Sequence, residues 1–283
     1  MSSDFTGDVE EELLISSLED KLDVVCGIST EGKMFGSIKE MWTTELGDNN
    51  ISTNSSRGRS RWYNQARDYW EDAGNCPSTI DGVLGGFASI SDLDLDGSQE
   101  FLLDLNEKRP LLNIEGGSCC DCGAGIGRIT KGLLLPIGFQ KCDLVEVSQR
   151  LIYAAPDFLG DNYAGKCRYL CIGLQDFDPK PKSYDLIWIQ WVIGHLTDVD
   201  CVKFLRRCAN GLKAGGVICI KDNTCSGEDA FIVDKDDSSL TRSLPYLLHL
   251  CSRAGLKVIL QKTQDNFPDS IYPVPIIALE QIE

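Results

Sequence analysis

The stretch SCCDCGAGIGRITK, residues 118–131, is the most informative part of the chain about its fold. Small and apolar residues in Ser118–Cys122 lead into three glycines, and a segment with helical character follows. Glycine adopts positive φ without a steric penalty and lets the backbone approach a ligand closely. The stretch therefore predicts a strand, a tight turn and a helix, an arrangement that often holds a nucleotide. Many such turns carry glycines for packing alone, so the turn does not identify its ligand.

Short apolar segments alternate with helical ones through the rest of the chain. The further expected strands are residues 141–147, 167–172, 184–189 and 216–220, with helices between them, such as 127–136 and 198–213. Apolar strands that alternate with helices are typical of a parallel sheet covered on both faces. Residues 255–280 predict two strands with no helix between them, an antiparallel pair at one edge, where Pro273 and Pro275 suit an edge strand.

The N-terminal region has a different composition. Residues 1–61 form an acidic extension and a polar linker, and the linker is the Ser/Asn-rich stretch 47–61. A short apolar periodicity in residues 11–29 fits either one or two weak helices or a partly disordered tail. One folded domain is expected over residues 62–283. Its first helix is indicated by Trp62, Ala66, Tyr69 and Trp70 at helical spacing, and Ser98 is an N-cap candidate for the second.

Charge and composition exclude several functional classes. The chain has 27 Lys and Arg against 43 Asp and Glu, a net charge of -16, so non-specific nucleic-acid binding is not expected. This acidity suits a basic partner or serves only solubility. The 13 cysteines lie mostly in apolar runs, which indicates free thiols in a reducing compartment. With only His195 and His249 as histidines, no metal site is expected. No signal peptide or membrane span is visible, so we expect an intracellular protein, nuclear or cytoplasmic, with no membrane partner.

The residues around the glycine turn narrow the choice of ligand. The spacing of Gly123, Gly125 and Gly127 departs from the dinucleotide fingerprint, and no Gly-Lys-Ser/Thr ending of a phosphate-binding loop follows. A carboxylate at Asp121 would repel a pyrophosphate but suits a cation. S-adenosylmethionine (SAM) carries a sulfonium and an amino group and has no phosphate. Arg128, at the positive end of the following helix, is positioned to pair with the carboxylate of such a ligand.

Further candidates lie where the next strands end. Glu146 follows the glycines by about 20 positions, where an acidic residue accepts hydrogen bonds from ribose hydroxyls. Leu174 and Gln175 follow the third strand, in a position to flank an adenine. Because parallel strands present their carboxyl ends at one edge, Gln190 joins this group.

The fourth and fifth strands end in further polar side chains. Trp191 and His195 follow the fourth strand and are active-site candidates, although taken alone Trp191 fits a core position and His195 a loop histidine. The fifth strand ends in Lys-Asp-Asn, residues 221–223, which is more polar than a connecting loop needs. The segment 233–242 contains several Asp and Ser residues, and on its own it fits an N-cap region for a helix that begins near Ser239.

Six segments in a fixed order resemble the protein α-N-terminal methyltransferases: DCGAGIGRITK, GLQDF, YDLIWIQWVIGHLTD, FLRRC, IKDN and DSSLTR. The resemblance runs from Trp62 to Ala278. It implies an α/β fold, the Rossmann-like SAM-dependent methyltransferase fold, with a mostly parallel seven-stranded sheet, helices on both faces, an N-terminal helical addition and a β-hairpin insertion before the last helix. It also implies methylation of the free α-amine of basic X-Pro-Lys-type protein N-termini after removal of the initiator Met.

The resemblance also implies roles for individual residues. The cofactor contacts would be Gly123, Gly125, Arg128, Glu146, Leu174, Gln175 and Gln190, where Glu146 replaces the Asp usual in the family. The peptide contacts would be Leu84, Gly85, Ile90, Trp191, Asn223, Asp234, Ser239 and Tyr272, with Trp70 in the helical segment that closes over the site. His195 and Asp237 match the pair that takes the proton of the amine, and Asn223 lies beside them in the catalytic group.

Two other functions remain open at the level of sequence. A small-molecule N- or O-methyltransferase would share the glycine turn and Glu146 but would not need the IQWVIGH or KDN segments. A binding protein that lost catalysis would not need His195, Asn223 and Asp237 together. A DNA adenine methyltransferase is disfavoured by the acidic charge and by IQWV at the fourth strand. The number of methyl groups transferred is left open.

Overall fold

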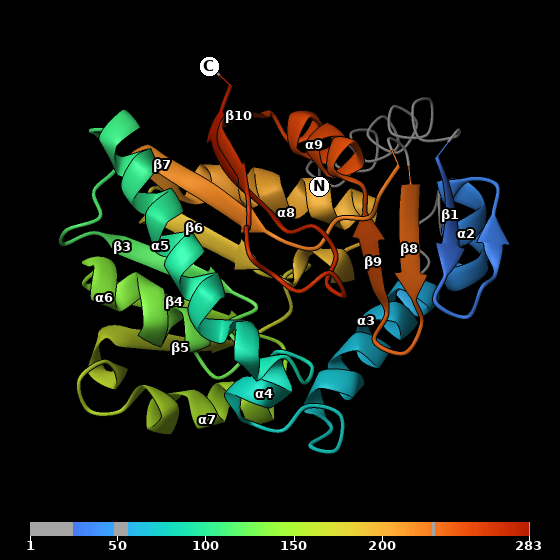
Figure 1. The fold of residues 1–283 in the computed structure, drawn as a ribbon, viewed down its shortest axis with the longest axis horizontal. Helices are drawn as coiled ribbons and strands as arrows, with labels where there is room; N and C mark the ends of the chain where they lie inside the picture. Colours follow the sequence, from blue (N-terminus) through green and yellow to red (C-terminus); the bar gives the residue numbers. More distant parts are fainter. Residues whose placement is uncertain (1–24, 48–55, 228–229, 283) are drawn as a thin grey trace, which may run out of the picture.

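The computed structural model describes residues 25–47, 56–227 and 230–282 (Figure 1). Its larger sheet has seven strands in the order β10-β11-β7-β6-β3-β4-β5. Their bounds are β3 Ser118–Cys122, β4 Lys141–Glu146, β5 Cys167–Cys171, β6 Tyr184–Gln190, β7 Leu212–Lys221, β10 Leu256–Thr263 and β11 Pro275–Gln281. β5, β4, β3, β6 and β7 run parallel to one another, and β11 runs antiparallel to both of its neighbours, β7 and β10. This confirms the mostly parallel seven-stranded sheet that the sequence implies.

Helices cover both faces of this sheet. The helices are α2 Ile38–Leu46, α3 Ser56–Glu71, α4 Ile80–Val83, α5 Ser91–Lys108, α6 Leu135–Ile137, α7 Gln149–Leu159, α8 Asp198–Gly211 and α9 Leu244–Arg253. Successive side chains of a strand point to opposite faces. In β6, Ile187 and Ile189 therefore pack in the core that α8 and α9 cover, while Leu186 and Trp188 pack in the core that α5, α6 and α7 cover.

The second sheet has four strands in the order β2-β1-β8-β9. Its strands are β1 Cys26–Ser29, β2 Met34–Phe35, β8 Ala230–Asp234 and β9 Ser239–Arg242. β8 and β9 form the expected β-hairpin before α9, so a helix beginning near Ser239 is wrong. β1 adds to β8 in parallel, and Figure 1 shows β1, β2 and α2 beside this hairpin.

Part of the expected extension and linker is folded. Residues 25–47 form β1, β2 and α2, and α3 begins at Ser56, six residues before Trp62. The polar composition of this stretch does not predict a helix, but its polar side chains bond to other elements of the fold. Arg59, for example, donates to both carboxylate oxygens of Asp200, at 2.7 and 3.0 Å. Most of the periodic stretch 11–29 and the middle of the linker lie outside the described residues.

Three local expectations need correction. Ser98 is not an N-cap, because α5 begins at Ser91; its buried hydroxyl instead donates to the Asp94 carbonyl at 2.7 Å. The helix after the glycine turn is a π-helix over Thr130–Leu134 that continues into α6. The outer strand is β10, not the proline-bearing β11; Pro275 is tolerated because it is the first residue of β11 and lies beyond the pairs with β7. Each helix in the described part of the chain is too short or too polar to cross a bilayer.

Candidate active site

A cavity lies at the carboxyl ends of β3, β4 and β6. Of the residues expected from the sequence, it is lined by Gly123, Gly125, Arg128, Glu146, Leu174, Gln175, Gln190, Trp191, His195 and Trp70. The cavity therefore brings together the whole cofactor set and part of the catalytic and peptide sets. Apolar lining residues that the sequence did not single out include Tyr63, Val83, Leu151, Ile172 and Val192. Their spacing in the sequence is that of ordinary buried residues, so no sequence pattern distinguishes them as cavity residues.

The glycine turn is held against the end of β4. Gly123 and Gly125 have φ of 72° and 54°, and a Cβ at Gly123 would lie 2.6 Å from the Val192 Cβ, so another residue would not fit. The Gly125 amide donates to Glu146 Oε2 at 2.9 Å, and the Ser148 amide donates to Oε1 at 2.8 Å. Burial raises the pKa of Glu146. Each of its oxygens keeps a further lone pair, so the carboxylate can still accept from a ribose diol.

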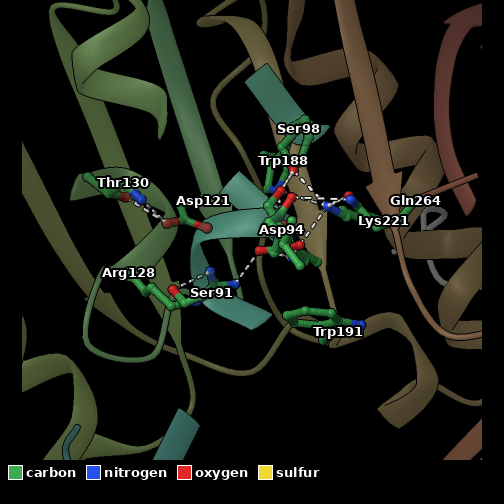
Figure 2. Close-up of polar contacts among 12 residues, drawn as sticks. Ser91, Asp94, Ser98, Asp121, Arg128, Thr130, Trp188, Trp191, Lys221 and Gln264 are labelled. Carbon is green, nitrogen blue, oxygen red and sulfur yellow. Dashed lines mark hydrogen bonds and ion pairs between the residues drawn. The ribbon is translucent and has the colours of Figure 1, made fainter. Parts of the chain in front are cut away.

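Asp121 lies beneath the turn. Its Oδ2 accepts from the Thr130 amide at 3.1 Å and from the Thr130 hydroxyl at 2.6 Å, which anchors the start of the π-helix (Figure 2). Burial raises the pKa of Asp121 to about 6. A carboxylate at this depth in the cavity suits a cationic ligand better than a phosphate.

Asp94 is the centre of a buried ionic cluster that the sequence did not reveal (Figure 2). Its carboxylate lies 2.8 Å from Arg128 Nη2 and 2.5 Å from Lys221 Nζ, and Asp94 and Lys221 are both 0% exposed. Gln190 Nε2 donates to both oxygens of Asp94, at 2.8 and 2.9 Å. The Gln190 carbonyl is held in turn by Trp188 Nε1 at 2.8 Å. Two cavity-lining side chains, Arg128 and Gln190, are thus fixed by one residue of α5.

The charge of this cluster supports a carboxylate-bearing ligand. Arg128 and Lys221 are two cations that share the carboxylate of Asp94, and Arg128 also lines the cavity. Burial lowers the pKa of Lys221, and the neighbouring Asp94 carboxylate opposes this shift. A buried charge is stable only when it is paired. The amino-acid end of SAM carries a carboxylate, so the cluster and the glycine turn together fit this cofactor.

Trp191 connects the cluster to the end of β7. It has a φ of 52°, unusual for a residue with a side chain, and its indole N–H donates to Asn223 Oδ1 at 3.2 Å. The Arg128 guanidinium lies 5.6 Å from the centre of the Trp191 ring. Asp222 accepts from the amides of Val192 and Asn223, at 3.2 and 2.8 Å, and burial raises the pKa of Asp222 to about 6. Backbone strain of this kind is typical of functional sites.

Both ring nitrogens of His195 have partners. Nδ1 lies 3.1 Å from the Ser238 carbonyl, and Nε2 lies 3.1 Å from the indole N–H of Trp70. Because Trp70 can only donate, Nε2 is the acceptor and Nδ1 carries the proton. Asp237 lies next to Ser238 in the turn of the hairpin, and its buried Oδ1 has no hydrogen-bond partner within the described ranges.

The remaining candidates are not among the residues that line the cavity. Leu84 and Ile90 are buried, and Gly85, between them, has a φ of 58° and open space around the place of a Cβ. Asp234 and Ser239 are the last residue of β8 and the first of β9. Tyr272, in the loop between β10 and β11, is 44% exposed.

Comparison with known proteins shows which family the chain resembles. Residues 58–280 match the family described as AdoMet dependent proline di-methyltransferase. The chain is 48% identical over 222 residues to N-terminal Xaa-Pro-Lys N-methyltransferase 1 of Danio rerio, an alignment that covers 78% of this chain and 96% of the relative. For the protein of the same description from Homo sapiens, the identity is 44% over 220 residues, covering 77% of this chain and 95% of the relative.

Solved structures give the same result. A SAM-dependent methyltransferase from Leishmania major is 35% identical, with a TM-score of 0.76, and the match covers 90% of this chain and 96% of that one. The magnesium protoporphyrin IX methyltransferase of Synechocystis, solved with bound SAM, is 13% identical with a TM-score of 0.56, over 81% of this chain and 100% of that one, and shares the fold. The chain thus belongs to the family of AdoMet dependent proline di-methyltransferases, whose methyl donor SAM is its cofactor.

Proposed function

We propose that this protein transfers methyl groups from SAM to the free α-amine of proteins that begin with X-Pro-Lys or a similar sequence, once the initiator Met is removed. The observation that carries the proposal is that the cavity is lined by His195, whose ring contacts the hairpin turn at Ser238, and by Trp191, whose indole donates to Asn223. The Xaa-Pro-Lys specificity in the names of the relatives supports the same substrate class.

The cavity residues divide between cofactor and peptide. When bound, SAM supplies a methyl group on a sulfonium. Glu146 would hold the ribose hydroxyls, Leu174 and Gln175 would flank the adenine, and Arg128 with Gln190 would orient the carboxylate of the amino-acid end. Gly123 and Gly125 let the backbone come close. Together these residues would hold SAM in the cavity that Trp191 also lines.

The α-amine must lose a proton before it can attack. Its pKa is about 8, so much of it is protonated at neutral pH, whereas a Lys side chain, at about 10.4, is protonated more completely. We assign proton acceptance to Asp237, whose Oδ1 has a free lone pair, or to His195 after Trp70 releases Nε2. Alignment of amine, methyl and sulfur then supplies much of the acceleration.

Each of the first three substrate residues would contact a different set of side chains. Leu84, Ile90 and Trp191 would form apolar surfaces suited to the Pro ring, with Gly85 leaving room for the chain to pass. The Asn223 side-chain carbonyl accepts from Trp191, and its amide NH₂ would donate to a peptide carbonyl. Asp234 would pair with the Lys ammonium, while Ser239 and Tyr272 would contact the peptide backbone beyond it.

Incubation of the enzyme with SAM and defined peptides, followed by mass spectrometry, tests this proposal. An X-Pro-Lys peptide should gain methyl groups on its α-amine, and the same peptide with an acetylated N-terminus should gain none. Methylation of a panel of small amines but not of the peptide would favour the small-molecule alternative. Cofactor binding without any turnover would favour a binding protein. Because all 13 cysteines are free, we place the reaction in a reducing compartment, the nucleus or the cytoplasm.

A further inference from the structure

We propose that residues 25–47 are a positioning element for substrate recognition: they fix the β8–β9 hairpin and draw Lys235 away from the carboxylates that receive the substrate Lys. This inference rests on the proposed function. The segment lies outside residues 58–280, the part that matches the family. Three sets of contacts carry the argument, one through the backbone, one through two tryptophans and one through Lys235.

The backbone contacts make β1 a part of the hairpin sheet. Residues Cys26–Ser29 pair with β8 from Ala230 to Val233, and the Thr30 amide donates to the Val233 carbonyl at 2.9 Å. A Cβ on Gly27 would lie 2.4 Å from the Phe231 ring, so the strand can approach this closely only with glycine there. The edge of β8 is thereby covered up to the residue before Asp234.

Two tryptophans, Trp42 and Trp62, connect α2 to β9 and to His195. Trp42 Nε1 donates to Asp198 Oδ2 at 2.6 Å, and Asp198 also pairs with Arg242 of β9 at 2.8 Å. The Trp42 ring packs edge-on against Trp62, with ring centres 5.1 Å apart. Trp62 Nε1 then donates to the His195 carbonyl at 2.7 Å. Displacement of α2 would therefore disturb His195 and β9 together.

Lys235 is the decisive residue. It stands in the hairpin turn, directly after Asp234 and before Asp236, where its ammonium would neutralise the turn. Its Nζ lies instead 3.4 Å from Glu31 and 3.8 Å from Glu45, both from the N-terminal segment. An ammonium tethered to the same turn acts at an effective concentration in the millimolar range or above. Without Glu31 and Glu45 it would compete with the substrate Lys.

The turn keeps its negative charge as a result. Burial raises the pKa of Asp234, and the neighbouring carboxylates of Asp237, Asp236 and Glu31 raise it further. The buried Oδ1 of Asp237 has no partner among the described residues. A nearby cation stabilises the ionised form of carboxylates whose pKa is raised or that lack a partner. A peptide Lys would supply that cation.

The test is the double variant E31Q/E45Q, assayed with X-Pro-Lys and X-Pro-Gln peptides. We expect the KM for the Lys peptide to rise roughly threefold, with kcat and the Kd of SAM unchanged, because ion pairs that water still reaches contribute little individually. The KM for the Gln peptide should not change, since it has no cation to be displaced. Adding K235A should restore the KM for the Lys peptide. Met34→Gln, at a residue 68% exposed on β2, is the matched control and should behave as wild type.

Several outcomes would overturn the inference. An unchanged KM for the Lys peptide in E31Q/E45Q, equal losses with both peptides, or no restoration by K235A each contradict the role of Lys235. For the backbone contacts, Gly27→Val should lower kcat/KM for both peptides while the Kd of SAM stays constant; retained kcat/KM would contradict the positioning role. If wild-type enzyme methylates neither peptide, the proposed function itself fails, which is a separate result.

Discussion

Asp94 shows how one buried side chain controls others that face the ligand. Asp94→Asn removes the only carboxylate shown between Arg128 and Lys221 in the described cluster (Figure 2). Breaking a buried ion pair costs about 3–5 kcal/mol, because the remaining charge is uncompensated. We expect a lower Tm and a weaker Kd for SAM, with a smaller effect on peptide KM.

Asp96 provides the control for this variant. It is an exposed acid on the same helix, so Asp96→Asn should leave both the Tm and the Kd of SAM close to wild type. Unchanged Tm and SAM affinity in Asp94→Asn would show that the cluster does not need this counter-ion. Calorimetry and titration with SAM give the two measurements.

Asp121 gives a prediction that depends on pH. Burial raises its pKa from 3.8 to about 6, so ionised Asp121 destabilises the folded state. One pKa unit corresponds to ~1.4 kcal/mol, so ionised Asp121 lowers the free energy of unfolding by an amount on the order of 2–3 kcal/mol above pH 6. This destabilisation disappears as the pH falls toward 4, because the folded protein takes up the proton. Asp121→Asn can still accept both bonds from Thr130. Its Tm should exceed that of wild type at pH 8, and the difference should narrow as the pH falls through 6; a constant difference would contradict this account.

Asp237 can be tested by its effect on turnover. Asp237→Asn removes the negative charge with little change of shape, and loss of a general base typically lowers the rate by about 10²–10⁴-fold. We expect kcat to fall within that range while the Kd of SAM is retained. Normal turnover would remove Asp237 from the mechanism and leave His195 as the acceptor.

The sequence reveals some of these residues and hides others for a physical reason. Gly123, Gly125 and Glu146 could be recognised because a tight turn and a strand end place local demands on residue type. Asp94 could not, because the segment SDLDLDGS has an acid at every second position and only the packing of α5 decides which one is buried. The pairing of Trp70 with His195 also depends on contacts between distant segments.

At the scale of elements, the repeated strand–helix pattern made the larger sheet predictable, and β3 has the expected bounds. The N-terminal sheet was not predictable. β1 has four residues and pairs with β8 about 200 positions away, so neither length nor periodicity marks it. The π-helix was missed because it has the same apolar pattern as an α-helix.

Trp42 allows the stability of this added sheet to be measured. Trp42→Phe keeps an aromatic ring against Trp62 but leaves the Asp198 carboxylate without one of its donors. Loss of a hydrogen bond to a buried charged group costs about 1.5–3 kcal/mol. The midpoint of denaturant unfolding should therefore fall, whereas Met34→Gln should leave it in place. An unchanged midpoint would mean that the bond between α2 and Asp198 adds nothing to stability.

At the level of the complete chain, the net charge of -16 leads to a prediction about ionic strength. A protein of this charge would attract basic N-termini over distances that salt shortens, since the Debye length is about 10 Å at 0.1 M and about 3 Å at 1 M. Raising the ionic strength should therefore raise the KM for an X-Pro-Lys peptide while kcat stays nearly constant. An X-Pro-Gln peptide has one positive charge fewer, so its KM should respond less steeply. Equal slopes for the two peptides would mean that the acidity keeps the protein in solution and takes no part in attracting the substrate.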